Sequence, residues 1–255
     1  MTIQNTSNGS DGEERQYVWL VRYGLTEYPL VESVGPFDSD IDPTVGIEHA
    51  NSIATRMTQS GASAPAVVYA SPFLRTVHTA HIIAQKANGA AVRIEEGLTE
   101  WQVPSLLVTP DGTHTHPQTA ATHVTKFPLV DATYQSVNAA SSTGAEGSPH
   151  FPETEENLVV RCAATLDKLL GDTTSENQNM AIVSHAPCNI ALALHLEGSS
   201  LKESKREPWP LGGLTLFSRP MQGGPWRLEF YGCSDHMPGE YKAGLKRWTL
   251  PSLQN

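Results

Sequence analysis

Five side chains suited to phosphate binding and proton transfer stand at comparable points of the chain, each close behind a short apolar run. They are Arg22, Tyr23, Arg75, Glu100 and His185. A guanidinium group binds phosphate oxygens through paired hydrogen bonds, and a carboxyl group beside such a pocket can pass a proton to a leaving oxygen. These residue types predict a phosphate pocket with acid–base chemistry, provided that the fold brings them together.

The apolar runs that precede these residues are expected to be neighbouring strands of one sheet. Continuous runs without polar alternation are typical of parallel strands that are covered on both faces. The candidate strands are YVWLVR (17–22), AVVYA (66–70), AVRIE (91–95) and MAIVSH (180–185). Because ligands of open α/β sheets bind beyond the carboxyl ends of the strands, the candidate residues should meet at one edge of the sheet.

Helical patterns alternate with these strands, over segments 44–61, 71–89, 153–171 and 186–196, and two late strands follow at 214–219 and 226–232. Ser71 is expected to cap the second helix, with Pro72 at its first position. The order predicts an α/β protein: a single three-layer α/β/α domain with a mostly parallel central sheet and helices on both faces.

The predicted domain spans residues 16–255 and follows a polar tail at 1–15 that is expected to be disordered. Between about residues 102 and 151 the periodic pattern stops, and Thr, Ser, Pro and Gly dominate. Such a stretch inside a domain predicts an irregular insert that covers the site as a lid or shapes it for a substrate. Residues 233–255 are expected to form an irregular C-terminal tail.

The composition of the chain limits the classes of binding partner and the cellular compartments that we expect. A formal charge of −10 and a pI of about 5.4 argue against direct binding to nucleic acid or a membrane, although arginines gathered in one pocket can still bind phosphate. The three cysteines are widely spaced and outside any CxxC pattern, which indicates a reducing compartment. The chain shows no secretory signal pattern and no membrane-length apolar run. We therefore expect a cytoplasmic or nuclear protein that is not secreted.

Four segments resemble, in order, the signature segments of the histidine phosphatase (phosphoglycerate mutase-like) superfamily: LVRYGLTEY, VVYASPFLRTVHTAHIIA, EEGLTEW and AIVSHAPCNIAL. The segment GLTEW is most similar to the corresponding segment in one branch of this superfamily. That branch holds the suppressor-of-T-cell-receptor-signalling phosphatases and a phosphatase-like subunit of an RNA polymerase III transcription factor. The resemblance implies that Arg22, Arg75 and His185 bind the phosphoryl group together with Thr26. It also implies that Glu100 acts first as the general acid and later as the general base.

The position that matches the family's attacking histidine is Tyr23, because the first segment of the family reads Arg-His-Gly. A phenol has a pKa near 10, so about one molecule in a thousand is ionised at pH 7, and half ionisation requires about 4 kcal/mol of stabilisation. The phosphotyrosine ester that it would form has a poorer leaving group than phosphohistidine, so hydrolysis should stall. The sequence thus favours an impaired or inactive phosphatase that binds a phospho-ligand or serves as a scaffold.

Other interpretations stay open. The retained Arg22, Arg75, Glu100 and His185 also fit an active phosphomonoesterase that works through a phosphoenzyme, either by another route or with Tyr23 standing in place of a native histidine. A different α/β hydrolase or transferase would leave the order of the four segments unexplained. The expected partners are a phosphorylated small molecule or a phosphoprotein, with inorganic phosphate or sulfate in the same pocket, and a protein partner is compatible with the scaffold interpretation.

No cofactor or metal ion is expected. The segment HTHP (114–117) and the nearby His123 are interpreted as parts of a solvated loop, since acidic or thiol ligands at metal-binding spacing are scarce around them. His78 and His81 share one helical face and are interpreted as core or edge residues. Ser184 and His185 are adjacent on a strand and point to opposite faces, so they are not expected to form a nucleophile–base couple.

Overall fold

The computed structural model of the chain describes residues 14–27, 38–108, 111–139, 151–171, 179–239 and 245–254. Its centre is a six-stranded sheet in the order β3-β2-β4-β1-β6-β7. The strands are β1 (Arg15–Arg22), β2 (Val67–Ala70), β3 (Ala91–Ile94), β4 (Met180–Ser184), β6 (Leu214–Pro220) and β7 (Arg227–Cys233).

The first four strands in the sheet order are parallel, and β6 and β7 extend the sheet with antiparallel pairing. The register places Arg22 opposite Ser184 and Ala70 opposite Val183. The carboxyl ends of β1, β2 and β4 therefore lie together, and this is the edge at which the sequence places the candidate residues.

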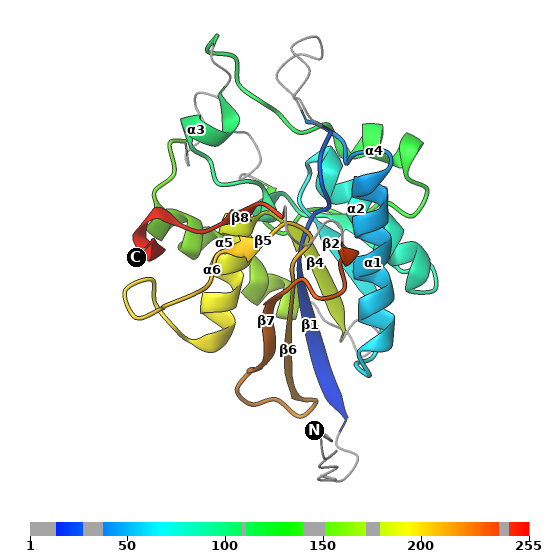
Figure 1. Cartoon of the computed structure of the whole chain (residues 1–255), viewed down its shortest axis with the longest axis vertical. Coiled ribbons are helices and arrows are strands. Elements are labelled where there is room, and N and C mark those ends of the chain that lie inside the picture. The colour runs from blue at the N-terminus through cyan, green and yellow to red at the C-terminus, as the bar shows by residue number, and fades with distance from the viewer. Residues whose placement is uncertain are drawn as a thin grey trace.

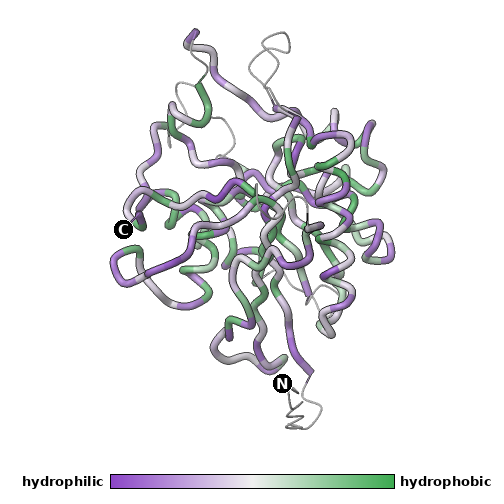
Figure 2. The backbone as a smooth tube through the Cα atoms, in the orientation of Figure 1, coloured by the Kyte–Doolittle hydropathy of each residue, from purple (hydrophilic) through white to green (hydrophobic). Residues whose placement is uncertain are grey.

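Helices cover both faces of the sheet, as Figure 1 shows: α1 (Val45–Gln59) and α2 (Leu74–Lys86) on one side, α5 (Glu155–Gly171) and α6 (Ala186–Glu197) on the other. Alternate residues of each strand serve the two faces. In β1, Val18 and Leu20 belong to the core beneath α5 and α6, whereas Trp19 and Val21 belong to the core beneath α1 and α2. The apolar strands thus run inside the molecule, and its outer loops are mostly hydrophilic (Figure 2). The predicted α/β/α architecture is confirmed.

The predicted insert contains more regular structure than its composition suggested. Its described residues form the short helices α3 (Pro104–Leu107) and α4 (Ala120–Lys126); the 3-10 turn η1 (Glu96–Leu98) precedes the insert. Phe127 and Val130 at the end of α4 are buried against the α1/α2 side of the core. Burial of these apolar side chains explains why a stretch rich in Thr and Pro nevertheless packs on the domain. Residues 109–110 and 140–150 of the insert lie outside the described part.

The two ends of the predicted domain differ in how much of them is described. Residues 1–13 of the predicted tail lie outside the described part, and β1 begins at Arg15. At the other end, the segment expected to be irregular contains β8 (Arg247–Trp248), which pairs antiparallel with β5 (Trp209–Pro210), and the 3-10 turn η3 (Pro251–Leu253). Leu250 is fully buried there, so the segment is anchored to the core. Over the ranges that the structure describes, no helix has the length and apolar character needed to span a membrane.

Candidate functional site

Strand β1 delivers Arg22 and Tyr23 to the edge of the sheet and then turns closely past the start of α1. The next residue, Gly24, lies so near that helix that a Cβ atom on it would stand 2.6 Å from the carbonyl oxygen of Gly46. No side chain can occupy that space without moving backbone. The glycine after Tyr23 is therefore required by packing, and it fixes the position of the residue before it.

Arg75 lies in the first turn of α2 and is almost fully buried. The expected N-cap role of Ser71 is wrong. The helix begins later, with Phe73 as its N-cap residue and no side-chain cap bond from it, and the hydroxyl of Ser71 is engaged elsewhere. The carboxylate of Asp38 takes the capping role instead, because it accepts a hydrogen bond from the backbone N–H of Leu74.

Glu100, Arg75 and His185 meet around one ring nitrogen, although they come from three different parts of the chain. Glu100 Oε2 lies 2.9 Å from Nδ1 of His185 and 3.4 Å from Nη2 of Arg75. Nη2 of Arg75 is 3.2 Å from the same Nδ1. His185 stands at the junction between β4 and α6, and Ser71 Oγ lies 2.8 Å from its other ring nitrogen, Nε2. The structure thus brings these three predicted site residues into direct contact.

Arg22 also reaches this region, but part of its guanidinium group is used to hold the backbone. Its Nη1 donates to the carbonyl oxygens of Trp209, at 2.7 Å, and Lys246, at 3.0 Å, which ties the β5–β8 pair to the end of β1. Its Nε–H is buried, and so is the Nε–H of Arg75; neither has a hydrogen-bond partner among the described residues. Because buried donors are nearly always satisfied, these two guanidinium donors are available to an anionic ligand.

Tyr23 lies between the two arginines and beside the histidine. The Cζ atoms of Arg75 and Arg22 are 4.9 and 5.9 Å from the centre of its ring, and the ring of His185 is 5.5 Å away, edge to face. These distances are those of cation–π and aromatic contacts. The side chain is only half-buried, so the tyrosine is the part of the cluster that meets solvent.

The charges in the cluster are strongly coupled. Burial opposes the charge of Glu100, but His185 and Arg75 overcome it and lower the pKa of that carboxyl to about 2. Burial lowers the pKa of His185 to about 4, against the attraction of Glu100. Tyr23 and Glu100 overcome the effect of burial on Arg75 and raise its pKa. At neutral pH the free site therefore holds a carboxylate and a neutral imidazole, so Glu100 must first take up a proton before it can act as an acid.

Thr26, the remaining predicted phosphate-binding residue, follows Tyr23 by three residues. It forms an isolated antiparallel bridge with Ile41, and within the described ranges no hydrogen bond joins its side chain to Arg22, Arg75 or His185.

A buried ion pair holds the loop that carries Glu100, and the sequence analysis missed both members. Arg161 of α5 pairs with Glu153 through two contacts, Nε to Oε1 at 2.7 Å and Nη2 to Oε2 at 2.8 Å. Nη1 of Arg161 also donates to the carbonyl oxygens of Gly97, at 2.8 Å, and Thr99, at 3.1 Å. Since Glu100 follows Thr99 directly, the pair fixes the position of Glu100 in the cluster. The local sequence pattern around Glu153 and Arg161 is that of an ordinary solvated helix with acidic residues at its start, so it gives no sign that the two residues are buried.

The histidines considered as metal ligands have other roles. His78 Nδ1 contacts Asp40 Oδ1 at 2.8 Å, and the ring of His81 packs on Phe127. The interpretation of His123 as part of a solvated loop is wrong, because its side chain is buried with Nε2 2.8 Å from the carbonyl oxygen of Pro72. Across the described residues, no group of three or more metal-binding side chains comes together.

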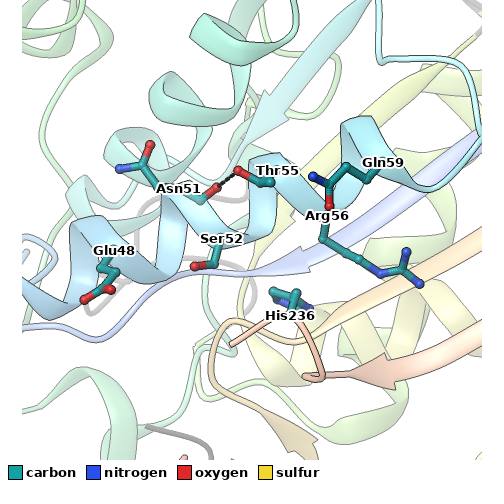
Figure 3. Close-up of a pocket in the computed structure, with 7 residues that line it drawn as sticks. All are labelled: Glu48, Asn51, Ser52, Thr55, Arg56, Gln59 and His236. Atoms are coloured by element: carbon teal, nitrogen blue, oxygen red, sulfur yellow. Dashed lines mark hydrogen bonds between the residues drawn. The ribbon is translucent and has the colours of Figure 1, made fainter. Parts of the chain in front are cut away.

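A separate polar groove of about 290 Å³ lies along the outer side of α1, away from the cluster described above. Figure 3 shows its wall of helical side chains and His236, which closes it from the segment after β7. Nε2 of His236 is 3.0 Å from the carbonyl oxygen of Gly212. The groove lacks the paired arginines of the sheet edge, so the candidate site is the cluster of Tyr23, Arg75, Glu100 and His185.

Comparison with curated proteins gives a partial match. The human and mouse proteins named "Ubiquitin-associated and SH3 domain-containing protein B" are each 29% identical to this chain over 148 residues. The match covers 54% of this chain and 20% of each relative. The chain thus corresponds to one fifth of the length of these relatives.

Comparison with solved structures supports the fold over most of the chain. The ecdysone phosphate phosphatase from Bombix mori, in complex with tungstate, has a TM-score of 0.61 at 18% identity, with 86% of this chain and 93% of that chain covered. A phosphoserine phosphatase from Entamoeba histolytica, in complex with 3-phosphoglyceric acid, has a TM-score of 0.53 at 21% identity, with 87% and 99% covered. Residues 18–233 match the histidine phosphatase superfamily (branch 1). The chain is therefore a member of the histidine phosphatase superfamily.

Proposed function

We propose that this protein binds a phosphorylated ligand in the pocket at the carboxyl edge of the sheet and is impaired or inactive as a phosphatase. The observation that carries the proposal is the pair of buried Nε–H donors of Arg22 and Arg75, which lack partners beside Tyr23. Two guanidinium groups and an imidazole N–H around one small space form a cradle for a tetrahedral oxyanion.

The impairment follows from the chemistry of Tyr23, which takes the place of the family's attacking histidine. In the family reaction the nucleophile bonds to phosphorus while the bond to the leaving oxygen breaks, and Glu100 would protonate that oxygen. A phenol at Tyr23 would have to lose its proton first, and the carboxylate of the cluster, Glu100, has a pKa of about 2 and is a weak base. An ester formed at Tyr23 would also lose its phosphoryl group slowly. Binding without turnover is the outcome that these groups support.

The alternative is an active phosphomonoesterase, and it rests on the retention of Arg22, Arg75, Glu100 and His185. The solved relatives named above are phosphatases, of ecdysone phosphate and of phosphoserine, and one of them holds tungstate, a phosphate analogue. They support a phosphorylated small molecule as the ligand class; a phosphoprotein remains the second candidate. For this alternative, binding of a phosphate dianion next to Glu100 would have to raise the pKa of that carboxyl so that it can carry the proton.

The compartment proposed with this function is cytoplasmic or nuclear. It rests on the three free cysteines, of which Cys162 and Cys188 are buried. Fractionation of cells that express the full chain tests this, since recovery from the culture medium would contradict it.

Titration calorimetry with inorganic phosphate and with tungstate tests the binding function. We expect weak binding by the intact protein and none by Arg75→Ala, because that substitution removes half of the clamp. Arg227→Ala is the matched control, as this arginine is 73% exposed on the edge strand β7 and should leave the affinity unchanged. Absence of binding to the intact protein at millimolar anion would refute the proposal.

A further inference from the structure

Ser71 is a buried residue that contacts His185 of the cluster and is not itself one of the proposed phosphate-binding groups. Its backbone is held on both sides: the N–H donates to the carbonyl oxygen of Val183 at 3.0 Å, and the carbonyl oxygen accepts from the hydroxyl of Thr76 at 2.8 Å. The residue has no exposed surface. Its hydroxyl is thereby directed at Nε2 of His185, 2.8 Å away.

The other ring nitrogen of His185 is the one that faces the pocket. Glu100 Oε2 and Arg75 Nη2 both approach Nδ1, at 2.9 and 3.2 Å. Ser71 therefore lies behind the imidazole, on the far side from the two groups that would contact a ligand. Ser71, His185 and Glu100 form a hydrogen-bonded chain that resembles a hydrolase triad, but the serine is sealed behind the ring, and this position excludes it as a nucleophile.

The positions of the protons follow from what each partner can do. A neutral imidazole has one N–H and one lone pair. The carboxylate of Glu100 can only accept, so its 2.9 Å contact requires the proton on Nδ1. Nη2 of Arg75, 3.2 Å from Nδ1, can only donate, and its N–H is directed to Oε2 of Glu100, 3.4 Å away. Nε2 then carries the lone pair, and the hydroxyl of Ser71 is the donor that satisfies it. The opposite tautomer would set the Nδ1 lone pair against a negative charge.

We propose that Ser71 is a positioning residue of the pocket: its hydroxyl donates to Nε2 and thereby keeps neutral His185 in the tautomer that offers Nδ1–H to a phosphoryl oxygen. An oxyanion that takes the place of Glu100 at Nδ1 receives a hydrogen bond from an uncharged ring. The edge-to-face contact with Phe73, with ring centres 5.3 Å apart, fixes the plane in which this N–H points. The affinity part of this inference rests on the proposed function, whereas the tautomer part stands by itself.

The test uses the full chain with three substitutions. Ser71→Ala removes the donor, and Ser71→Thr keeps a hydroxyl at the same position. Ser218→Ala is the matched control, since Ser218 is equally buried and its hydroxyl is hydrogen-bonded, to Arg15, at the other end of the sheet. If Ser71→Ala does not fold, Ser71→Cys replaces it, because a thiol of nearly the same size is a much weaker donor.

Two readouts are measured at pH 7: the ¹⁵N chemical shifts of the His185 ring and the affinity for inorganic phosphate. We expect the Nδ1–H tautomer in the intact protein, in Ser71→Thr and in Ser218→Ala. We expect a shift toward Nε2–H and about a tenfold loss of phosphate affinity in Ser71→Ala, the loss being what removal of one hydrogen bond to a charged ligand causes.

An Nε2–H tautomer in the intact protein, or an unchanged tautomer in a folded Ser71→Ala, would overturn the inference. If the intact protein shows the Nδ1–H tautomer but binds no phosphate, the proposed function fails and the role of Ser71 toward the ring survives. The two failures are therefore distinguishable.

Discussion

The guanidinium carbon of Arg75 lies 4.9 Å from the centre of the Tyr23 ring. A cation–π contact uses the face of a guanidinium group, whereas oxyanions bind to its N–H groups in the plane. Tyr23 therefore covers Arg75 with its ring, and its side chain also hydrogen-bonds that arginine. In the proposed function, the pocket combines an anion clamp of two arginines with an aromatic ring at the position of the family's nucleophile.

Replacement of Tyr23 by phenylalanine should leave phosphate affinity within about twofold of the intact protein, because the ring face that covers Arg75 is kept. Calorimetry with inorganic phosphate measures this. A loss of binding in the folded variant would mean that the phenol hydroxyl is itself an essential ligand group.

Gly24→Ala should destabilise the protein by roughly 1–3 kcal/mol, since the new methyl group would meet the backbone of Gly46 at 2.6 Å. Urea denaturation gives the free energy of unfolding. Gly171→Ala is the control, because a Cβ atom at that helical position meets nothing within 4 Å. Equal stabilities of the two variants would show that β1 does not pack as closely on α1 as described.

Glu153→Gln should be costly for the pocket as well as for the fold. It leaves the charge of Arg161 buried without its partner, which costs about 3–5 kcal/mol of unfolding free energy. The exposed Glu156 lies nearby in α5, the helix of Arg161, so Glu156→Gln is the matched control and should change stability by less than about 0.5 kcal/mol. A mild effect of Glu153→Gln would show that the loop before Glu100 does not depend on the pair.

Stability should fall as the pH drops below about 6.5, because His185 is buried in its neutral form with a pKa of about 4. Between pH 6.5 and pH 4, His185 is protonated in the unfolded chain and neutral in the folded chain. The free energy of unfolding therefore decreases with falling pH, by up to about 3 kcal/mol for this residue. Glu100, with its pKa lowered to about 2, extends the loss below pH 4.5.

Urea denaturation between pH 4.5 and 7 measures this dependence. His185→Asn should reduce its slope by about one proton per molecule, or about 1.4 kcal/mol per pH unit. His236, whose pKa burial also lowers to about 4, contributes to the part of the slope that remains. An unchanged slope in His185→Asn would mean that the ring is charged in the folded protein.

The sheet and most of the site could be predicted because their signals are local. Strand β1 is a continuous apolar run, and Arg22, Arg75 and His185 stand at strand ends or one turn beyond, where topology alone brings them together. The role of Ser71 could not be predicted. Ser before Pro is a regular helix-start pattern, and only the tertiary structure shows that Asp38 caps the helix while the serine hydroxyl turns to His185.

Tertiary structure, which has no local sequence signal, also explains why the Glu153–Arg161 pair and the burial of His123 were not predicted. Glu153 and Arg161 form a pair through the geometry of α5 against the Glu100 loop, and burial of charged residues has no sequence signal. His123 lies in a segment of loop-like composition, yet the apolar residues that follow it, Phe127 and Val130, bury this part of the insert.

The most direct test of the central claim is hydrolysis of p-nitrophenyl phosphate and a panel of phosphoesters by the intact protein beside Tyr23→His. The intact protein should remain at background, and Tyr23→His should exceed it at least roughly tenfold, a barrier difference of about 1.4 kcal/mol. Adding Glu100→Gln to that variant should abolish the gain. Robust turnover by the intact protein, or an inert but correctly folded Tyr23→His, would contradict the account.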